Sequence, residues 1–431
     1  MCPAALFALA WAGGSGISAM KLSRLQSVWE TKTWLCFFLI AIGFFLGWQV
    51  FGAGKQSSAL IRKNLKQRAV SNTENNRNAQ NNCPNTRGTG ISEMARRISN
   101  CIFFLTALSY AAFLLEAALL GYVPLFTTAT PHAYSYFHIS GVHYFTVSCV
   151  LVPSLFVLRV QSQFPGKSVR SILPETICTA LCMALPLLLV SRFQLLFGIL
   201  LAFFTWLLIS RKRIGDFLNR RMLLASIGGF CLLVVCYIFL TVERAHSISY
   251  LNGIFEMKNP QTPIWFTQPY IYIANNFDNF NCLVRDLPRH TYGLRMLFPF
   301  FALTGLKFAM PSLAAFPLYV TKEELTTVTL FYDAYYDFGM IGAAAFAFLL
   351  GALLSCFFGY LEQKQKNKDA FMNPLLYLIG AQLAFYCLFA FFTTWYSNPA
   401  TWFYLALSAM MFVYTGGANT SKAARKNKGI S

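Results

Sequence analysis

The residues of this sequence that could do chemistry are a few arginines and acid–base groups at the ends of long apolar stretches. An arginine can bind a phosphate through two parallel hydrogen bonds, and a carboxylate or an imidazole can accept the proton of a hydroxyl group. The candidate phosphate ligands are Arg192, Arg285, Arg289 and Arg295. The candidate proton acceptors are Glu116, His290, Asp333 and Asp337. These residues could therefore bind an anionic ligand and take up a proton.

The arginines fall in two places. Arg192 lies between two apolar stretches with almost no connecting loop, and the other three fall in one later segment beside Asp286. A helix over 280–290 would place Arg285 and Arg289 one turn apart on one face. Together the four arginines could form an electropositive basin above a membrane. Each could equally extend its aliphatic stem toward lipid headgroups, so the residues alone leave both interpretations open.

The acidic candidates also allow two interpretations. Asp333 and Asp337 stand four residues apart, so a helix would place both on one face. They could act on a hydroxyl group or be solvated carboxylates of an interfacial aromatic belt. Glu116, inside an apolar stretch, could face an outer cavity or bond to a neighbouring helix. The histidines of 131–145 lack zinc-site spacing and no CxxC pair occurs, so neither a metal nor another cofactor is expected.

Composition places these residues in a membrane protein. Of the 431 residues, 56% are hydrophobic and only 12% are charged, whereas soluble domains carry roughly a quarter charged residues. A helix that crosses the hydrocarbon core needs about 20 mostly apolar residues. Ten stretches qualify: 2–20, 34–53, 101–123, 141–160, 171–191, 193–210, 222–241, 329–358, 371–391 and 399–415. The sequence predicts an all-α polytopic membrane protein of about ten transmembrane helices.

The basic residues orient these spans. With the basic C-terminal tail inside, 24 of the 35 Lys and Arg residues fall on inner segments, as the positive-inside rule requires. Most of the net charge of +19 is thereby explained by topology, so nucleic-acid binding is not expected and both termini are expected in the cytoplasm. The expected divisions are two spans in 1–53, a disordered cytoplasmic linker in 54–100, five spans in 101–241, a large outer loop folded as a small cap in 242–328, three spans in 329–415 and a basic tail in 416–431.

Five short motifs occur in order between about residues 101 and 415. They are GYVPL at 121–125, HISGVHY at 138–144, Ser-Arg at 191–192, YIYIANNFDNF at 270–280 and YDFGMIG at 336–342. In order and placement they resemble bacterial oligosaccharide repeat-unit polymerases of the Wzy type, a family grouped with O-antigen ligases. The resemblance implies an enzyme of the inner membrane with its large loop in the periplasm. It would join oligosaccharides carried on undecaprenyl pyrophosphate into O-antigen, capsule or exopolysaccharide, by glycosyl transfer without a metal.

The resemblance also implies roles for the candidate residues. The arginines would stabilise the departing pyrophosphate, with Arg192 and Arg289 as first candidates, and one of the four proton acceptors would take the proton of the acceptor hydroxyl. The expected partners are the lipid-linked oligosaccharides, the bilayer and a chain-length regulator. Two alternatives stay open. One is a glycosyltransferase of the O-antigen ligase type, and the other is a transporter or flippase of lipid-linked saccharides.

Overall fold

The computed structural model describes residues 2–70, 86–127, 133–161, 172–210, 248–313, 315–366 and 372–428. Within these ranges the chain is helical, and its only β-structure is an isolated bridge between Ser23 and Met257. The long helices are α1 (Pro3–Ala19), α2 (Thr31–Val70), α3 (Thr86–Leu120), α6 (Val152–Gln161), α7 (Leu173–Leu188), α8 (Arg192–Ser210), α11 (Ile264–Asp286), α14 (Tyr332–Lys366), α15 (Leu375–Leu388) and α16 (Pro399–Lys428). The shorter ones are α4 (Ala133–Tyr136), α5 (Val142–Val147), α10 (Ile248–Phe255), α12 (Phe298–Leu303) and α13 (Leu306–Ala309).

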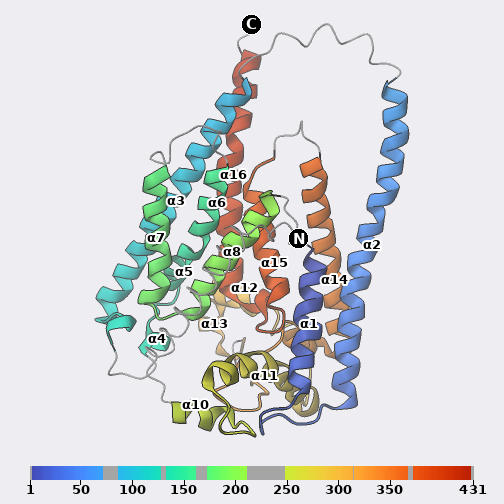
Figure 1. The fold of residues 1–431 in the computed structure, drawn as a ribbon, viewed down its shortest axis with the longest axis vertical. Helices are drawn as coiled ribbons and strands as arrows, with labels where there is room; N and C mark the ends of the chain where they lie inside the picture. Colours follow the sequence, from blue (N-terminus) through green and yellow to red (C-terminus); the bar gives the residue numbers. More distant parts are fainter. Residues whose placement is uncertain are drawn as a thin grey trace.

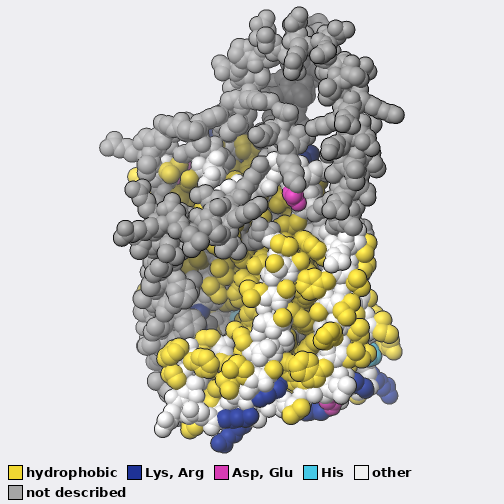
Figure 2. Space-filling view, turned by 45° about the vertical axis from the view of Figure 1, so that its right-hand side comes forward, with side chains coloured by type: hydrophobic (Ala, Val, Ile, Leu, Met, Phe, Trp, Pro, Cys, Tyr) yellow, Lys and Arg dark blue, Asp and Glu magenta, His cyan; other side chains and the backbone are white. Residues whose placement is uncertain are grey.

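The long apolar helices confirm an all-α membrane protein. Within the described residues, five segments are long and apolar enough to cross a bilayer: Thr31–Val50, Glu93–Leu120, Val142–Gln161, Arg192–Ser210 and Tyr332–Gln365. Three shorter apolar helices accompany them: Pro3–Ala19, Leu173–Leu188 and Leu375–Leu388. The predicted span 222–241 lies outside the described residues, and the predicted number of about ten spans is not confirmed. Figure 2 shows a broad hydrophobic surface with Lys and Arg side chains gathered at its lower end.

Helices α10 and α11 lie across the end of the bundle away from the C-terminus, together with the connection between α1 and α2 (Figure 1). We call this end of the molecule the α11 end. Trp11 of α1 connects the α11 end to the membrane helices. Its indole N–H donates to the carbonyl oxygen of Phe37 in α2 at 3.2 Å. The same ring packs against Phe277 of α11 and Phe331 at centroid distances of 5.4 and 5.3 Å. α11 is therefore held by the aromatic core of the bundle.

Glycines allow α2 and α14 to approach closely. A Cβ atom at Gly47 would lie 2.0 Å from the carbonyl oxygen of Phe348, and one at Gly351 would lie 2.2 Å from that of Phe44. Such contacts are far inside van der Waals distance, so only glycine fits at these two positions. This packing fixes α14, whose first turns carry two of the candidate carboxylates.

Candidate functional site

Asp337, in the first turns of α14, holds the turn that precedes α12. Its carboxylate is fully buried and accepts hydrogen bonds from the backbone N–H groups of Arg295 and Met296 at 3.2 and 2.8 Å. The hydroxyl group of Thr291 also donates to it. Because both oxygens already accept hydrogen bonds, the geometry favours a positioning role for Asp337 over abstraction of a proton.

Asp333 lies on the same side of α14, as the four-residue spacing predicts, and pairs with Arg295. The Asp333 side chain is buried and that of Arg295 is largely buried, with exposed fractions of 4% and 11%. The guanidinium also lies over the ring of Tyr336, at 4.5 Å from its centroid, and over that of Tyr332, at 5.2 Å. Arg295 is thus neutralised by Asp333 and fixed by the neighbouring aromatic rings. Less of its positive charge is therefore available to bind an anionic ligand.

His290 lies just before this turn and contacts the first turns of α14. Its Nδ1 lies 3.2 Å from the carbonyl oxygen of Tyr336. A carbonyl only accepts, so Nδ1 carries the proton and Nε2 is the acceptor nitrogen of the neutral ring. The ring lies against Gly339, where φ is +66° and α14 is interrupted. The neighbouring Arg289 is exposed and has no hydrogen-bond or ion-pair partner among the described residues.

Arg285 lies apart from Arg289. Helix α11 ends at Asp286, and Leu287 is extended because Pro288 follows it. A helix over 280–290, the condition for placing Arg285 and Arg289 on one face, therefore does not form. Arg285 instead pairs with Asp286 at 2.7 Å and lowers the pKa of that carboxyl through hydrogen bonding. The pair is exposed and adds little to stability.

Arg192 is the first residue of α8 and follows a turn in which Val190 has φ +52°. Its Nη1 donates to the side-chain oxygen of Gln268 at 3.1 Å, and Gln268 is buried in α11. Gln268 and Arg285 lie near opposite ends of α11, about 25 Å apart at about 1.5 Å per residue. The four candidate arginines therefore do not converge on one pyrophosphate.

Glu116 is fully buried near the end of α3. It accepts hydrogen bonds from the backbone N–H of Ile139 at 3.0 Å and from the hydroxyl group of Thr146 at 2.7 Å. Nδ1 of His143 lies 3.1 Å from its nearer oxygen. The structure thus brings together Arg295, His290, Asp333 and Asp337, whereas the contacts of Glu116 and of Arg192 lie on other elements.

Asp278 of α11 is a buried polar centre that the sequence reasoning missed. Its carboxylate accepts hydrogen bonds from Ser18 at 2.9 Å, Lys21 at 2.5 Å, Gln26 at 2.9 Å and Trp29 at 2.8 Å. Burial raises the pKa of the Asp278 carboxyl, and the Lys21 ammonium opposes that shift. This carboxylate fixes the α1–α2 connection on α11. The sequence signal was a single carboxylate among asparagines in the motif at 270–280.

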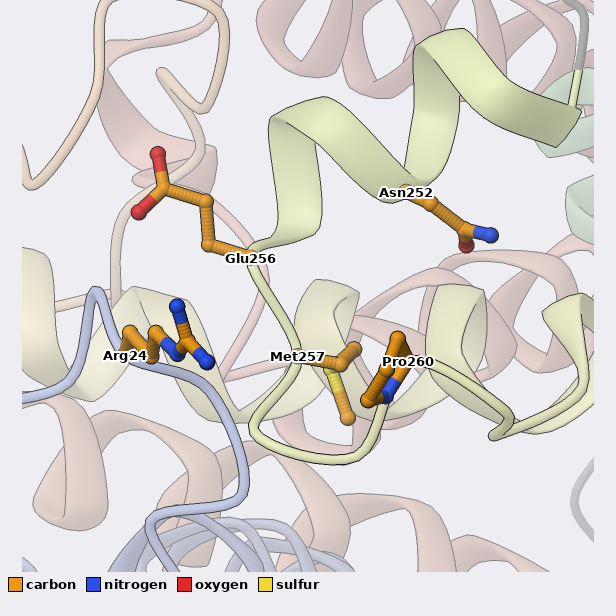
Figure 3. Close-up of a pocket in the computed structure, with 5 residues that line it drawn as sticks. All are labelled: Arg24, Asn252, Glu256, Met257 and Pro260. Atoms are coloured by element: carbon orange, nitrogen blue, oxygen red, sulfur yellow. The ribbon is translucent and has the colours of Figure 1, made fainter.

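A shallow pocket lies beside this connection and holds no candidate residue (Figure 3). It is lined by Arg24, Asn252, Glu256, Met257 and Pro260. The backbone N–H of Arg24 donates to the carbonyl oxygen of Glu256 at 2.8 Å, whereas the two side chains extend in different directions in Figure 3. We assign no chemistry to this pocket.

No family model matches the chain, and neither the curated proteins nor the solved structures include a match to it. Within the described residues, no three His, Cys, Asp or Glu side chains are grouped so that they could hold a metal ion. A functional assignment therefore depends on the placement of the chain's own residues.

Proposed function

We propose that this protein transfers a saccharide from a polyprenyl-pyrophosphate carrier to a hydroxyl group of a second lipid-linked saccharide, and so polymerises oligosaccharide repeat units. The observation that carries the proposal is Arg192, placed at the first residue of an apolar helix and oriented by a buried glutamine. A guanidinium at the end of a membrane-spanning helix can bind a phosphate group whose lipid chain stays in the bilayer. The N-terminus of α8 adds backbone N–H groups that favour an anion.

The other parts of the proposed site follow from the contacts above. Arg289 is exposed just beyond the other end of α11, away from Arg192, and would attract the anionic carriers electrostatically rather than share one pyrophosphate with Arg192. Arg295 and Asp333 would line one side of the site, and Asp337 would hold the turn that carries Arg295. The proton acceptor would then be an imidazole, since the oxygens of Asp333 and Asp337 are already engaged. The α11 end would face the periplasm of a bacterial inner membrane.

The proposal is tested in a strain that lacks the protein. Complementation with Arg192→Ala should leave single lipid-linked repeat units and no polymer, as in the deletion strain, because the pyrophosphate loses its ligand. Arg192→Lys should restore little, because an ammonium lacks the planar fork of a guanidinium. Arg24→Ala is the matched control, since it removes an exposed arginine from the same end and should leave polymer length unchanged.

Mass spectrometry of the lipid-linked saccharides, with expression of each variant confirmed, separates the outcomes. Polymer of normal length from Arg192→Ala would overturn the proposed role of this residue. Long polymer that stays on its lipid carrier in the deletion strain would identify a ligase instead. Single units confined to the cytoplasmic leaflet would identify a transporter.

A further inference from the structure

Glu116 and His143 form a carboxylate–imidazole pair at the end of α3. The His143 side chain is 28% exposed, and that of Glu116 is fully buried beneath it. On the basis of the proposed function, we infer that this pair is the general base of the saccharide transfer. His143 would be the catalytic residue that touches the acceptor hydroxyl, and Glu116 a positioning residue.

The hydrogen bonds of Glu116 determine which nitrogen of His143 is available. Three groups converge on its two oxygens, namely the N–H of Ile139, the hydroxyl of Thr146 and Nδ1 of the ring. A buried carboxylate with this many donors is an acceptor only, so Nδ1 of His143 carries a proton. In the neutral ring, Nε2 is then the nitrogen with the free electron pair. This is the orientation that a base requires when a carboxylate holds it from behind.

Packing keeps the pair in place. Phe137 is almost fully buried, and its ring lies 5.8 Å from that of Phe113 and 5.5 Å from that of Tyr122. These contacts hold the segment before His143 along the end of α3. Gly141, with φ +89°, then turns the chain into α5, which carries His143. A catalytic group needs such support because small displacements cost much of its effect.

The same segment connects the pair to Arg192. Leu125 and Tyr134 pack against Val190 and Leu195, which lie on either side of that arginine. The segment that carries the imidazole at its end is therefore in contact with the turn that carries the guanidinium. Transfer from a pyrophosphate requires both groups, one for the leaving phosphate and one for the acceptor.

His290 is the weaker base on the same criteria. Its Nδ1 faces the carbonyl oxygen of Tyr336, which is neutral, so no carboxylate balances the charge that this ring would gain. Its Nε2 lies against the backbone at Gly339, only 3.0 Å from where a Cβ atom would stand. His290 is the more exposed of the two residues, but only His143 has a carboxylate partner.

The step can be written with its atoms and electrons balanced. Nε2 of His143 takes the proton of the acceptor hydroxyl as that oxygen forms a bond to the anomeric carbon of the donor saccharide. The bond from that carbon to the phosphate oxygen breaks, and its electron pair leaves with the polyprenyl pyrophosphate. The Glu116 carboxylate balances the positive charge on the ring until the proton passes to water.

The test uses the purified full-length protein in lipid nanodiscs with lipid-linked repeat units isolated from the deletion strain. His143→Gly should lower kcat by about 100-fold or more, with KM nearly unchanged, and added imidazole should restore a measurable part of it. His143→Gln, whose amide can still donate to Glu116, should fold normally and be equally slow. Glu116→Gln should lower kcat by at least about 10-fold. Tyr136→Phe is the control, because this side chain lies in the same segment, is 69% exposed and does not contact Glu116, so kcat should stay unchanged.

Two results would overturn the inference. One is wild-type kcat from a folded His143→Gln variant, and the other is a folded His143→Gly variant that imidazole does not rescue. If the wild-type protein itself forms no polymer in this assay, it is the proposed function that fails. If the wild-type protein and the His143→Gln variant both form polymer, the proposed function is supported and only the role of His143 is refuted.

Discussion

Replacement of Asp337 tests whether this carboxylate holds a turn or takes part in chemistry. In Asp337→Ala, the backbone N–H groups of Arg295 and Met296 lose their acceptor, as does the hydroxyl of Thr291. The Asp337 side chain is fully buried, so water cannot replace its oxygens without rearrangement of the turn. We therefore expect the turn before α12 to loosen and the whole protein to lose stability.

The size of this effect follows from the number of bonds lost. An unpaired backbone N–H group that water reaches poorly costs about 1–3 kcal/mol, and the threonine hydroxyl can rotate toward another acceptor. Two such groups give a loss of about 3 kcal/mol for Asp337→Ala. Asp337→Asn keeps one acceptor oxygen and should lose about half of that, about 1.5 kcal/mol.

Denaturant unfolding of the purified protein in micelles, followed by tryptophan fluorescence, measures these differences. Asp286→Asn is the control, since that carboxylate is 41% exposed in a surface ion pair and should change the unfolding free energy by less than about 0.5 kcal/mol. Wild-type stability of Asp337→Ala would refute the argument from hydrogen bonds. Full stability of Asp337→Asn combined with complete loss of polymer would show that Asp337 takes part in the reaction.

Three further predictions concern packing, the Asp278 centre and sidedness. Gly47→Ala would place a Cβ atom 2.0 Å from a carbonyl oxygen of α14 and should lower the unfolding temperature, whereas the Cβ atom of Gly13→Ala meets nothing within 4 Å and should not. Equal unfolding temperatures of the two variants would contradict this. Asp278→Ala should lower the unfolding free energy by more than about 3 kcal/mol, because a partly buried ammonium and three neutral donors lose their buried acceptor. A loss below about 1 kcal/mol would contradict it. In a cysteine-free background, single cysteines at the exposed positions Arg24 and Tyr292 should both react with a membrane-impermeant thiol reagent added on the periplasmic side. Protection of either would place the α11 end on the other side.

Local patterns in the sequence predicted the elements but not their partners. Apolar length is a local property, so it located the spans that the structure describes, and spacing placed Asp333 and Asp337 on one side of α14. Pro288 is a local signal that α11 does not continue through 280–290, so the helix that would have placed Arg285 and Arg289 on one face does not form. Charge counts likewise could not show that Arg285 and Arg295 pair within the chain.

The polar contacts that define the candidate site join residues far apart in sequence. Asp278 meets Lys21 across 257 positions, and Arg192 meets Gln268 across 76. Neither pair has a periodicity that a window along the chain could detect. The Glu116–His143 pair spans 27 positions and depends on the left-handed turn at Gly141, so the spacing of the histidines alone did not reveal it.

The most direct test of the proposed function is polymer formation by the purified protein alone. The full-length chain in lipid nanodiscs is supplied with polyprenyl-pyrophosphate-linked repeat units, and the products are resolved by gel and mass spectrometry. The proposal predicts a ladder of lipid-linked polymers, with one polyprenyl pyrophosphate released for each unit added, and no ladder from Arg192→Ala. Units that stay single with the folded wild-type protein would contradict it.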